Sequence, residues 1–321
     1  MSDLPPPEAL LWNLIRGALG TKALGIAADL GVADALAAGP RSVAGLAEEN
    51  GADADTLHRI LRALASDGVF AEDEPGVFRN TEASELLRRD NGDRWPEFAH
   101  LFREAFYLAI GALDVHRTDV AFARAYGTDF WSWLATRPDE RSNFDRAMEG
   151  GQAARADRLA GLEWREDETV VDIGGGSGRL LRDLLERRPE LRGIVFDLPE
   201  ADRDQTVRGD RIAFLSGSFF EQVPEGDAYV LSKILHDWDD EPAAAILRTV
   251  RAAAPDEARL LVLDSVVPPG NDPAGVKWLD LLMLVLQRGR ERTESDWHAL
   301  LDGAGFRIEQ IEDGLIQARC R

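Results

Sequence analysis

The sequence predicts a two-part α/β protein: a mostly helical N-terminal part, then a seven-stranded, mostly parallel sheet with an antiparallel strand at its C-terminal end. Three observations support this prediction. The first 90 residues carry Ala and Leu at helical spacing, and from Thr169 onward short apolar runs alternate with amphipathic helices. The chain of 321 residues is also long enough for two domains, each with a core of its own.

The first helical segment covers residues 7–39. Its apolar spacing predicts two helices broken near Gly17–Gly20, and Gly39 with Pro40 is expected to close the second.

The next segment has the order helix, turn, helix, wing. Ser42 can cap a short helix that Gly51 ends, and Asp53 or Asp55 can cap a second helix. That second helix carries an apolar face of Leu57, Ile60, Leu61 and Leu64. The apolar pairs at 69–70 and 77–78 flank an acidic turn with Pro75 and Gly76, which predicts a β-hairpin. This is the order of a winged helix.

The charge argues against the nucleic-acid partner that a winged helix suggests. The whole chain has a net charge of −21, and residues 1–85 hold 6 Lys and Arg against 14 Asp and Glu. The predicted wing tip, Glu72–Glu74, would face phosphates with the wrong sign. The same balance disfavours an anionic membrane surface, so we expect an interface module that dimerises the chain.

Residues 96–160 are expected to form a mostly helical bridge rich in aromatic side chains. Most of these rings should pack in a core, and some can line a pocket for a flat ligand. They are Phe98, Phe102, Phe106, Tyr107, Phe122, Tyr126, Phe130, Trp131, Trp133 and Phe144.

The C-terminal half alternates strands and helices in the manner of a parallel sheet with right-handed crossovers. The expected strands are TVVDI, GIVF, IAFL, DAYVLS and ARLLVLD, separated by helices such as RLLRDLLERR and PAAAILRTVRAAA. The last two runs, FRIEQIE and LIQARC, have no helix between them and predict a closing hairpin.

A glycine-rich turn follows the first of these strands, in VVDIGGGSGRLL at 170–181. Glycines there let a ligand approach the backbone at a helix N-terminus. A dinucleotide site would require glycine at position 179, where Arg179 stands. The glycines instead fall at Gly174, Gly176 and Gly178 after Asp172, the D-x-G-x-G-x-G form used by S-adenosylmethionine (SAM) methyltransferases. The alternative is a merely tight turn.

Further polar residues end the next strands. Asp197 ends the second strand, where an acid can accept both ribose hydroxyls of a nucleoside. The third strand is followed by Ser218 and Phe219, and the fourth strand ends at Ser232. The carboxyl ends of parallel strands face one crevice. We therefore expect these three residues around an adenine ring.

His236 is the histidine placed for chemistry, just past the fourth strand. The acids after it, with Pro242, predict the start of a helix. An imidazole with a pKa near neutrality can take a proton from a phenol at this place. The other histidines, His58, His100, His116 and His298, are expected on helices. No metal is expected, and the lone Cys320 excludes an internal disulfide.

These motifs resemble the two-domain, SAM-dependent small-molecule O-methyltransferases, which include plant caffeic-acid-type enzymes and bacterial enzymes that modify aromatic antibiotics. The resemblance covers nearly the whole chain, and the order of the motifs makes it specific. They are FDRAM, VVDIGGGSG, FDLP, GSFF, LHDWDDE, LLVLDSVVP, LDLLML and GRERTESDW.

The resemblance implies roles for particular residues. The positions that hold SAM in the family are matched by Gly174, Asp197, Ser218, Phe219 and Ser232. His236 matches the general base, and the acids that orient this base are matched by Asp264 and Glu291. Relatives often have the longer Glu where Asp264 stands, and Asn where Leu282 stands. Asp264 should therefore reach less far, and Leu282 cannot make the polar contact of that Asn. The positions expected to line the acceptor pocket are Phe106, Trp131, Met148, Asp237, Asp280 and Met283.

The expected organisation is a winged-helix-like dimerisation domain at 1–95, a helical bridge at 96–160 and a Rossmann-like SAM-binding domain at 161–321. The expected product is S-adenosylhomocysteine (SAH), and the expected protein is a cytosolic homodimer. Three alternatives stay open: a C-methyltransferase or other SAM-using enzyme, with or without a metal; a ligand-responsive winged-helix regulator; and a catalytically silent SAM-binding partner.

Overall fold

The computed structural model describes residues 5–199, 201 and 210–321 and divides the chain into two compact units. The first comprises residues 1–111 and 134–150, and the second comprises 112–133 and 151–321. The 96–160 segment is therefore shared between the two units, and the boundary at 133/134 falls within helix α10 (Phe130–Ala135). No helix in the described ranges is long and apolar enough to cross a lipid bilayer.

The first unit begins with three helices where the sequence predicts two. They are α1 (Pro7–Ile15), α2 (Gly17–Asp29) and the short α3 (Val32–Ala35). The prediction that the second helix runs to Gly39 was wrong. Gly31 adopts the left-handed conformation at φ 63°, so the chain cannot continue α2 and begins the separate helix α3 instead.

The winged-helix order is confirmed. Ser42 caps α4 (Val43–Asn50), Gly51 ends it in the left-handed region, and Asp53 caps α5 (Ala54–Ser66). The wing consists of β2 (Phe70–Glu74) and β3 (Val77–Asn80), and the two-residue β1 (Arg41–Ser42) pairs with β3. Leu57, Leu61 and Leu64 of α5 lie in the core of this unit, packed with Phe70 and Phe78 of the wing.

Four further helices belong to the described part of the first unit. They are α6 (Glu82–Glu85), α7 (Trp95–Arg103), α8 (Ala105–Gly111) and α11 (Pro138–Met148). Gly25 of α2 lies so close to α7 that a Cβ atom there would stand 2.4 Å from the Cβ of Arg103, so glycine sets how closely these helices pack.

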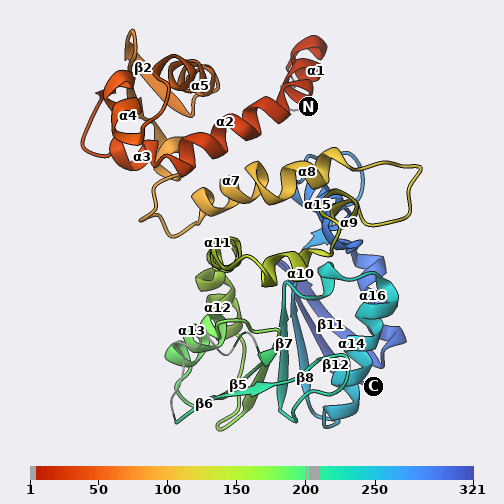
Figure 1. Ribbon diagram of the computed structural model, residues 1–321. Helices are drawn as coiled ribbons and strands as arrows, with labels where there is room; N and C mark the ends of the chain where they lie inside the picture. Colours follow the sequence, from red (N-terminus) through yellow and green to blue (C-terminus); the bar gives the residue numbers. More distant parts are fainter. Residues whose placement is uncertain (1–4, 200, 202–209) are drawn as a thin grey trace. The chain divides into compact units, whose positions relative to one another are not determined.

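The second unit contains the seven-stranded sheet, in the order β11-β12-β8-β7-β4-β5-β6 (Figure 1). The parallel strands are β4 (Thr169–Ile173), β5 (Arg192–Asp197), β6 (Ile212–Ser216), β7 (Ala228–Ser232) and β8 (Arg259–Leu263). The strand β12 (Leu315–Cys320) runs antiparallel to β8 and to the edge strand β11 (Phe306–Glu312). Every strand that the sequence predicts in this half is present, including the closing hairpin.

Helices cover both faces of this sheet. On one face, α14 (Asp240–Ala253) and α16 (Glu294–Gly303) bury apolar residues against Val171, Tyr229 and Leu260. On the other, α12 (Gln152–Ala160) and α13 (Arg179–Arg187) pack on Val170, Val230 and Leu261. Alternate residues of each strand thus enter different cores, as in a sheet buried on both faces. The remaining elements are α9 (Ala121–Tyr126), α15 (Gly275–Gln287), and the paired short strands β9 (Val266–Val267) and β10 (Arg292–Thr293).

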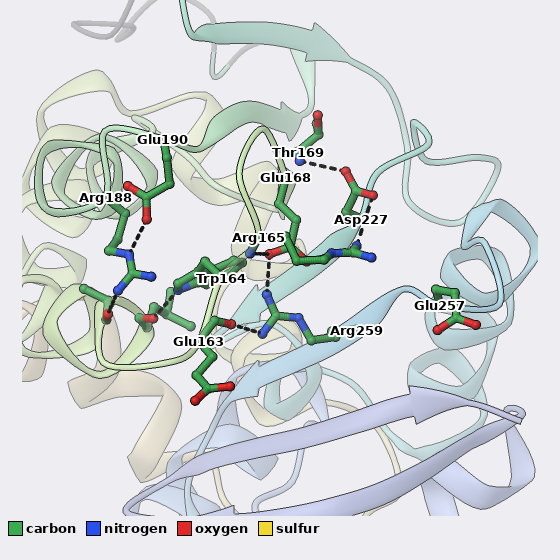
Figure 2. Close-up of polar contacts among 12 residues, drawn as sticks. Glu163, Trp164, Arg165, Glu168, Thr169, Arg188, Glu190, Asp227, Glu257 and Arg259 are labelled. Carbon is green, nitrogen blue, oxygen red and sulfur yellow. Dashed lines mark hydrogen bonds and ion pairs between the residues drawn. The ribbon is translucent and has the colours of Figure 1, made fainter.

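A cluster of hydrogen bonds and ion pairs connects the segment between α12 and β4 to the amino ends of the strands (Figure 2). The guanidinium of Arg259 donates to Glu168 Oε2 at 2.9 Å and to the carbonyl of Glu163 at 2.8 Å, and lies 4.3 Å from the centre of the Trp164 ring. Asp227, just before β7, accepts from Thr169 N at 2.8 Å. These contacts cover the amino ends of the strands. Ligands in folds of this type bind at the opposite, carboxyl ends.

Candidate active site

The glycine turn after β4 has the backbone that its sequence requires. Gly174, Gly176 and Gly178 all adopt positive φ, at 68°, 54° and 71°. A side chain on Gly175 would stand 2.7 Å from Asp172 Oδ2, so the turn is packed directly over that carboxylate. The helix α13 begins at Arg179. The turn therefore presents bare backbone at the carboxyl end of β4, which is the shape that a nucleoside cofactor needs.

Asp197 joins this turn from the neighbouring strand. Its Oδ2 accepts from Gly176 N at 2.8 Å and its Oδ1 accepts from Leu198 N at 2.6 Å. A carboxylate has about four lone-pair directions, so each of its oxygens can accept more than one hydrogen bond. The glycine turn and the strand-end acid are thus one connected unit.

Asp172 is a buried acid under the glycine turn, 2% exposed, and its Oδ2 has no hydrogen-bond partner within the described residues. Burial and the charge of Asp197 raise its pKa to about 7, although the positive Arg155 of α12 opposes the shift. Burial lowers the pKa of Arg155, against the attraction of Asp172 and Asp264. Beside the glycine turn, the carboxyl groups of Asp172 and Asp197 therefore outnumber the positive side chain of Arg155.

The other residues expected around an adenine ring lie at neighbouring strand ends. Ser218 Oγ accepts from Phe220 N at 3.3 Å, and Ser232 ends β7. The ring of Phe219 lies edge-on to that of Trp238, with centroids 6.1 Å apart, and a Cβ on Gly174 would stand 3.8 Å from Phe219. Phe219 therefore lies beside the glycine turn.

His236 lies in the single helical turn Leu235–Asp237 that follows β7, and it is 8% exposed. Its Nδ1 is 2.7 Å from Glu291 Oε1 and 3.6 Å from Asp264 Oδ1. The second distance exceeds a hydrogen bond, so the shorter Asp264 acts on the ring through its charge. Because a carboxylate only accepts, Nδ1 carries a proton and Nε2 holds the lone pair of the neutral ring.

The acids around His236 raise the pKa of its imidazole to about 9: burial lowers it, but the charge of Asp264 and the hydrogen bond to Glu291 outweigh burial. The expectation of a pKa near neutrality was therefore wrong. The reason is tertiary: Asp264 and Glu291 are 28 and 55 residues away in the sequence and meet the ring only in the fold.

Asp237 lies on the other side of the ring, with Oδ1 3.7 Å from His236 Nε2. Burial raises its pKa to about 6, although the charge of His236 works against the rise. Of the other positions expected to line an acceptor pocket, Asp280 accepts from Glu291 N at 2.8 Å and Met283 is buried on α15. Trp131 packs on Phe130 within the second unit, whereas Phe106 and Met148 belong to the first unit.

Three charged residues that sequence reasoning did not single out contact this site or its loops. Lys233 has a left-handed backbone at φ 59°, and its Nζ lies 3.5 Å from Asp264. Arg155 and Arg292 are the others. Lys233 directly follows the strand-end Ser232, so strand-end reasoning could have found it, and Arg292 lies in the motif GRERTESDW, whereas Arg155 shows no pattern in the sequence. The prediction of His116 on a helix was also wrong, since it lies in a turn.

Among the described residues, His236, Asp264 and Glu291 are also the group whose ligand atoms lie close enough to hold a metal, within 4.8 Å of one another. Both oxygens of Asp264 and Glu291 Oε2 have no hydrogen-bond partner in the described ranges. The acids thus concentrate negative charge around one imidazole.

The fold and the site together define a class: a nucleoside-binding α/β domain with a histidine held by acids at the carboxyl edge of the sheet. Two family models then match the chain, an O-methyltransferase domain over residues 107–307 and an O-methyltransferase dimerisation domain over 12–90. The chain belongs to the O-methyltransferase family and is a SAM-dependent enzyme of that family.

Similar proteins are known from bacterial biosynthesis. The chain is 38% identical to the phenazine O-methyltransferase PhzM of Lysobacter antibioticus, over 95% of this chain and 93% of that protein. The crystal structure of LaPhzM superimposes with a TM-score of 0.90 at 37% identity, covering 99% of this chain and all of that one. NcsB1 from neocarzinostatin biosynthesis, bound to SAH and 1,4-dihydroxy-2-naphthoic acid, gives 0.79 at 32% identity, covering 95% and 96%.

Proposed function

We propose that this chain methylates a phenolic hydroxyl of a small aromatic natural product, with His236 as the general base. The observation that carries the proposal is the orientation of the His236 ring, whose Nδ1 is held by Glu291 at 2.7 Å so that Nε2 is the nitrogen left for a substrate. The substrate class is supported by the relatives, whose names include aromatic compounds: a phenazine, a hydroxybenzoate and a naphthoic acid.

The residues of the glycine turn fit SAM. Gly174 and Gly176 offer backbone without side chains, and Asp197 offers carboxylate oxygens to ribose hydroxyls. Asp172, whose Oδ2 has no hydrogen-bond partner among the described residues, offers negative charge to a cationic ligand when it is ionised. We propose Ser218, Phe219 and Ser232 as the walls around the adenine. When bound, SAM supplies a methyl group that is already activated on a sulfonium.

The remaining chemistry belongs to the protein. His236 Nε2 accepts the proton of the acceptor hydroxyl, which raises the nucleophilicity of the oxygen, and Glu291 and Asp264 stabilise the imidazolium that results. Asp237, 3.7 Å from Nε2, is placed to accept from a second polar group of the acceptor. Alignment of the hydroxyl with the methyl group is the larger contribution, worth roughly 7–11 kcal/mol in favourable models.

A direct test uses the purified protein, SAM with a labelled methyl group, and a panel of hydroxylated phenazines and naphthoates with their O-protected counterparts. We expect label on oxygen of at least one free phenol, none on the protected compound, and no effect of a chelator. Label on carbon, or activity lost to the chelator and restored by a divalent metal, would contradict the proposed chemistry.

The acids around His236 make the reaction pH-dependent. A base must be neutral to accept a proton, and with a pKa of about 9 only about one per cent of His236 is neutral at pH 7. We expect kcat/KM to rise about tenfold per pH unit below that pKa. Replacing Glu291 by Gln removes one negative charge from beside the imidazolium, which lowers the pKa of His236. The rise in kcat/KM should therefore move to lower pH. An unshifted profile in Glu291→Gln would show that this acid does not set the protonation of His236.

We further propose a homodimer formed through the N-terminal part, within the domain organisation 1–95, 96–160 and 161–321. Its support is the match to a dimerisation domain and the exposed apolar face of α1 and α2, where Trp12, Ile15 and Leu19 are 61%, 72% and 74% exposed. Sedimentation of the chain should give a dimer, and Ile15→Glu should shift it towards monomer. A wild-type monomer at micromolar concentration would exclude this assembly.

A further inference from the structure

Beyond Lys233, whose N donates to the carbonyl of Leu263 at 3.1 Å, the loop that carries His236 pairs with no sheet strand among the described residues. It leaves β7 at Ser232, makes one helical turn at Leu235–Asp237, and enters α14 at Asp240. Without further ladder hydrogen bonds, the loop needs other partners for its carbonyl groups. These partners come from the chain just after α15, the segment 289–292, which we call the strap.

The first contact between strap and loop is a close approach of backbones. Arg290 N donates to the carbonyl of His236 itself at 2.9 Å. A Cβ atom on Gly289 would lie 2.2 Å from that same carbonyl oxygen and 2.7 Å from the carbonyl carbon of Asp237. Glycine is therefore required at 289 for space, since any side chain would push the histidine loop away.

The second contact is made by Arg292, whose side chain is fully buried. Its Nη1 donates to the carbonyl of Leu235 and its Nη2 to the carbonyl of Trp238, both at 2.9 Å. These are the residues on either side of the His236–Asp237 pair. The guanidinium thus bridges the two ends of the catalytic turn.

Arg292 also ties this turn to the helix that follows. Its Nε and Nη2 donate to Asp240 Oδ1 at 3.1 and 3.0 Å, and its guanidinium carbon lies 5.4 Å from the centre of the Trp297 ring. Four directed contacts use the planar fork of a guanidinium, which the single ammonium of lysine does not reproduce. The geometry is specific to arginine.

The strap also carries Glu291, between the residues that hold the loop. Glu291 N donates to Asp280 of α15 at 2.8 Å, and its carboxylate holds His236 Nδ1. One segment of four residues thus fixes the backbone of the catalytic turn from both ends and the side chain of its histidine.

We propose that Gly289 and Arg292 are positioning residues of the methyl transfer, which set the place and the orientation of His236 Nε2. The inference rests on the proposed role of His236 as base. Loss of either residue moves the loop relative to Glu291, and a displacement of about 1 Å is enough to lower turnover about a hundredfold. The glycine turn that binds SAM is not part of the strap and should keep its affinity.

The test compares Gly289→Ala and Arg292→Lys with Gly303→Ala, a control at the end of α16 where a Cβ meets no atom within 4 Å. We expect kcat to fall about a hundredfold in both strap variants and the SAM dissociation constant to stay within about threefold. The apparent pKa of the kcat profile should fall, because the ring leaves its acids. Gly303→Ala should match the wild type in all three measurements.

A strap variant that binds SAM and keeps the kcat and the pH profile of the wild type would overturn the proposal. If both buried variants fail to fold, Asp240→Asn tests it at the half-exposed end of the Arg292 network, where a three- to tenfold fall in kcat is expected and an unchanged kcat and pH profile would equally overturn it. An inactive wild type would instead refute the proposed function itself, so the two failures are distinguishable.

Discussion

Replacing His236 by Gln should lower the turnover of methyl transfer by about 10²- to 10⁴-fold, because a positioned general base contributes that much. Glutamine is polar and of similar length, so the loop should keep its shape, but an amide is not basic enough to take up the proton of the hydroxyl. SAM affinity should change little, since the glycine turn and Asp197 are untouched. Turnover under saturating SAM and calorimetric titration with SAM check the two halves of this prediction.

The chain offers a matched control for this substitution. His298 lies exposed on α16 of the same unit, and His298→Gln should have the turnover of the wild type. Unchanged turnover in His236→Gln would remove this residue from the role of base and leave alignment as the source of the rate. A loss of SAM binding would instead indicate that the histidine loop supports the cofactor.

Replacing Asp197 by Ala should weaken SAM binding about a hundredfold or more. The substitution removes the acceptors proposed for the ribose hydroxyls, and hydrogen bonds to charged groups contribute about 1.5–3 kcal/mol each. It also removes the acceptor of Gly176 N, so the turn loses one of its supports. Calorimetric titration with SAM and with SAH should show the same loss for both, because the two ligands share the ribose.

Asp256→Ala is a suitable control, because this acid is 91% exposed in its side chain and lies just before β8, at the other edge of the sheet. Asp197→Asn separates the two effects: it keeps one oxygen that can accept from Gly176 N, and should lose less affinity than Asp197→Ala. Equal SAM affinity in wild type and Asp197→Ala would place the ribose elsewhere.

Much of the fold could be predicted because it is recorded in local patterns. The strands of the sheet appear as apolar runs, α4 and α5 have capping residues in Ser42 and Asp53, and β2 and β3 form a hairpin around the acidic turn. The end of α2 was missed, because Gly31 is one of several glycines in that segment and only its positive φ distinguishes it. The roles of the site residues and the three-part division stay predictions.

The sequence by itself determined the class of this protein: the glycine turn, the strand-end acids and the order of the motifs identify a SAM-dependent O-methyltransferase. The acidic charge of its winged helix predicted an interface module, and the match to a dimerisation domain agrees with that prediction. Only the tertiary structure decided how basic His236 is and which contacts hold the turn that carries it. Asp264, Glu291 and Arg292 come from distant segments. Their effect depends on distances of a few ångströms in a buried place, where a charge acts strongly because little water screens it.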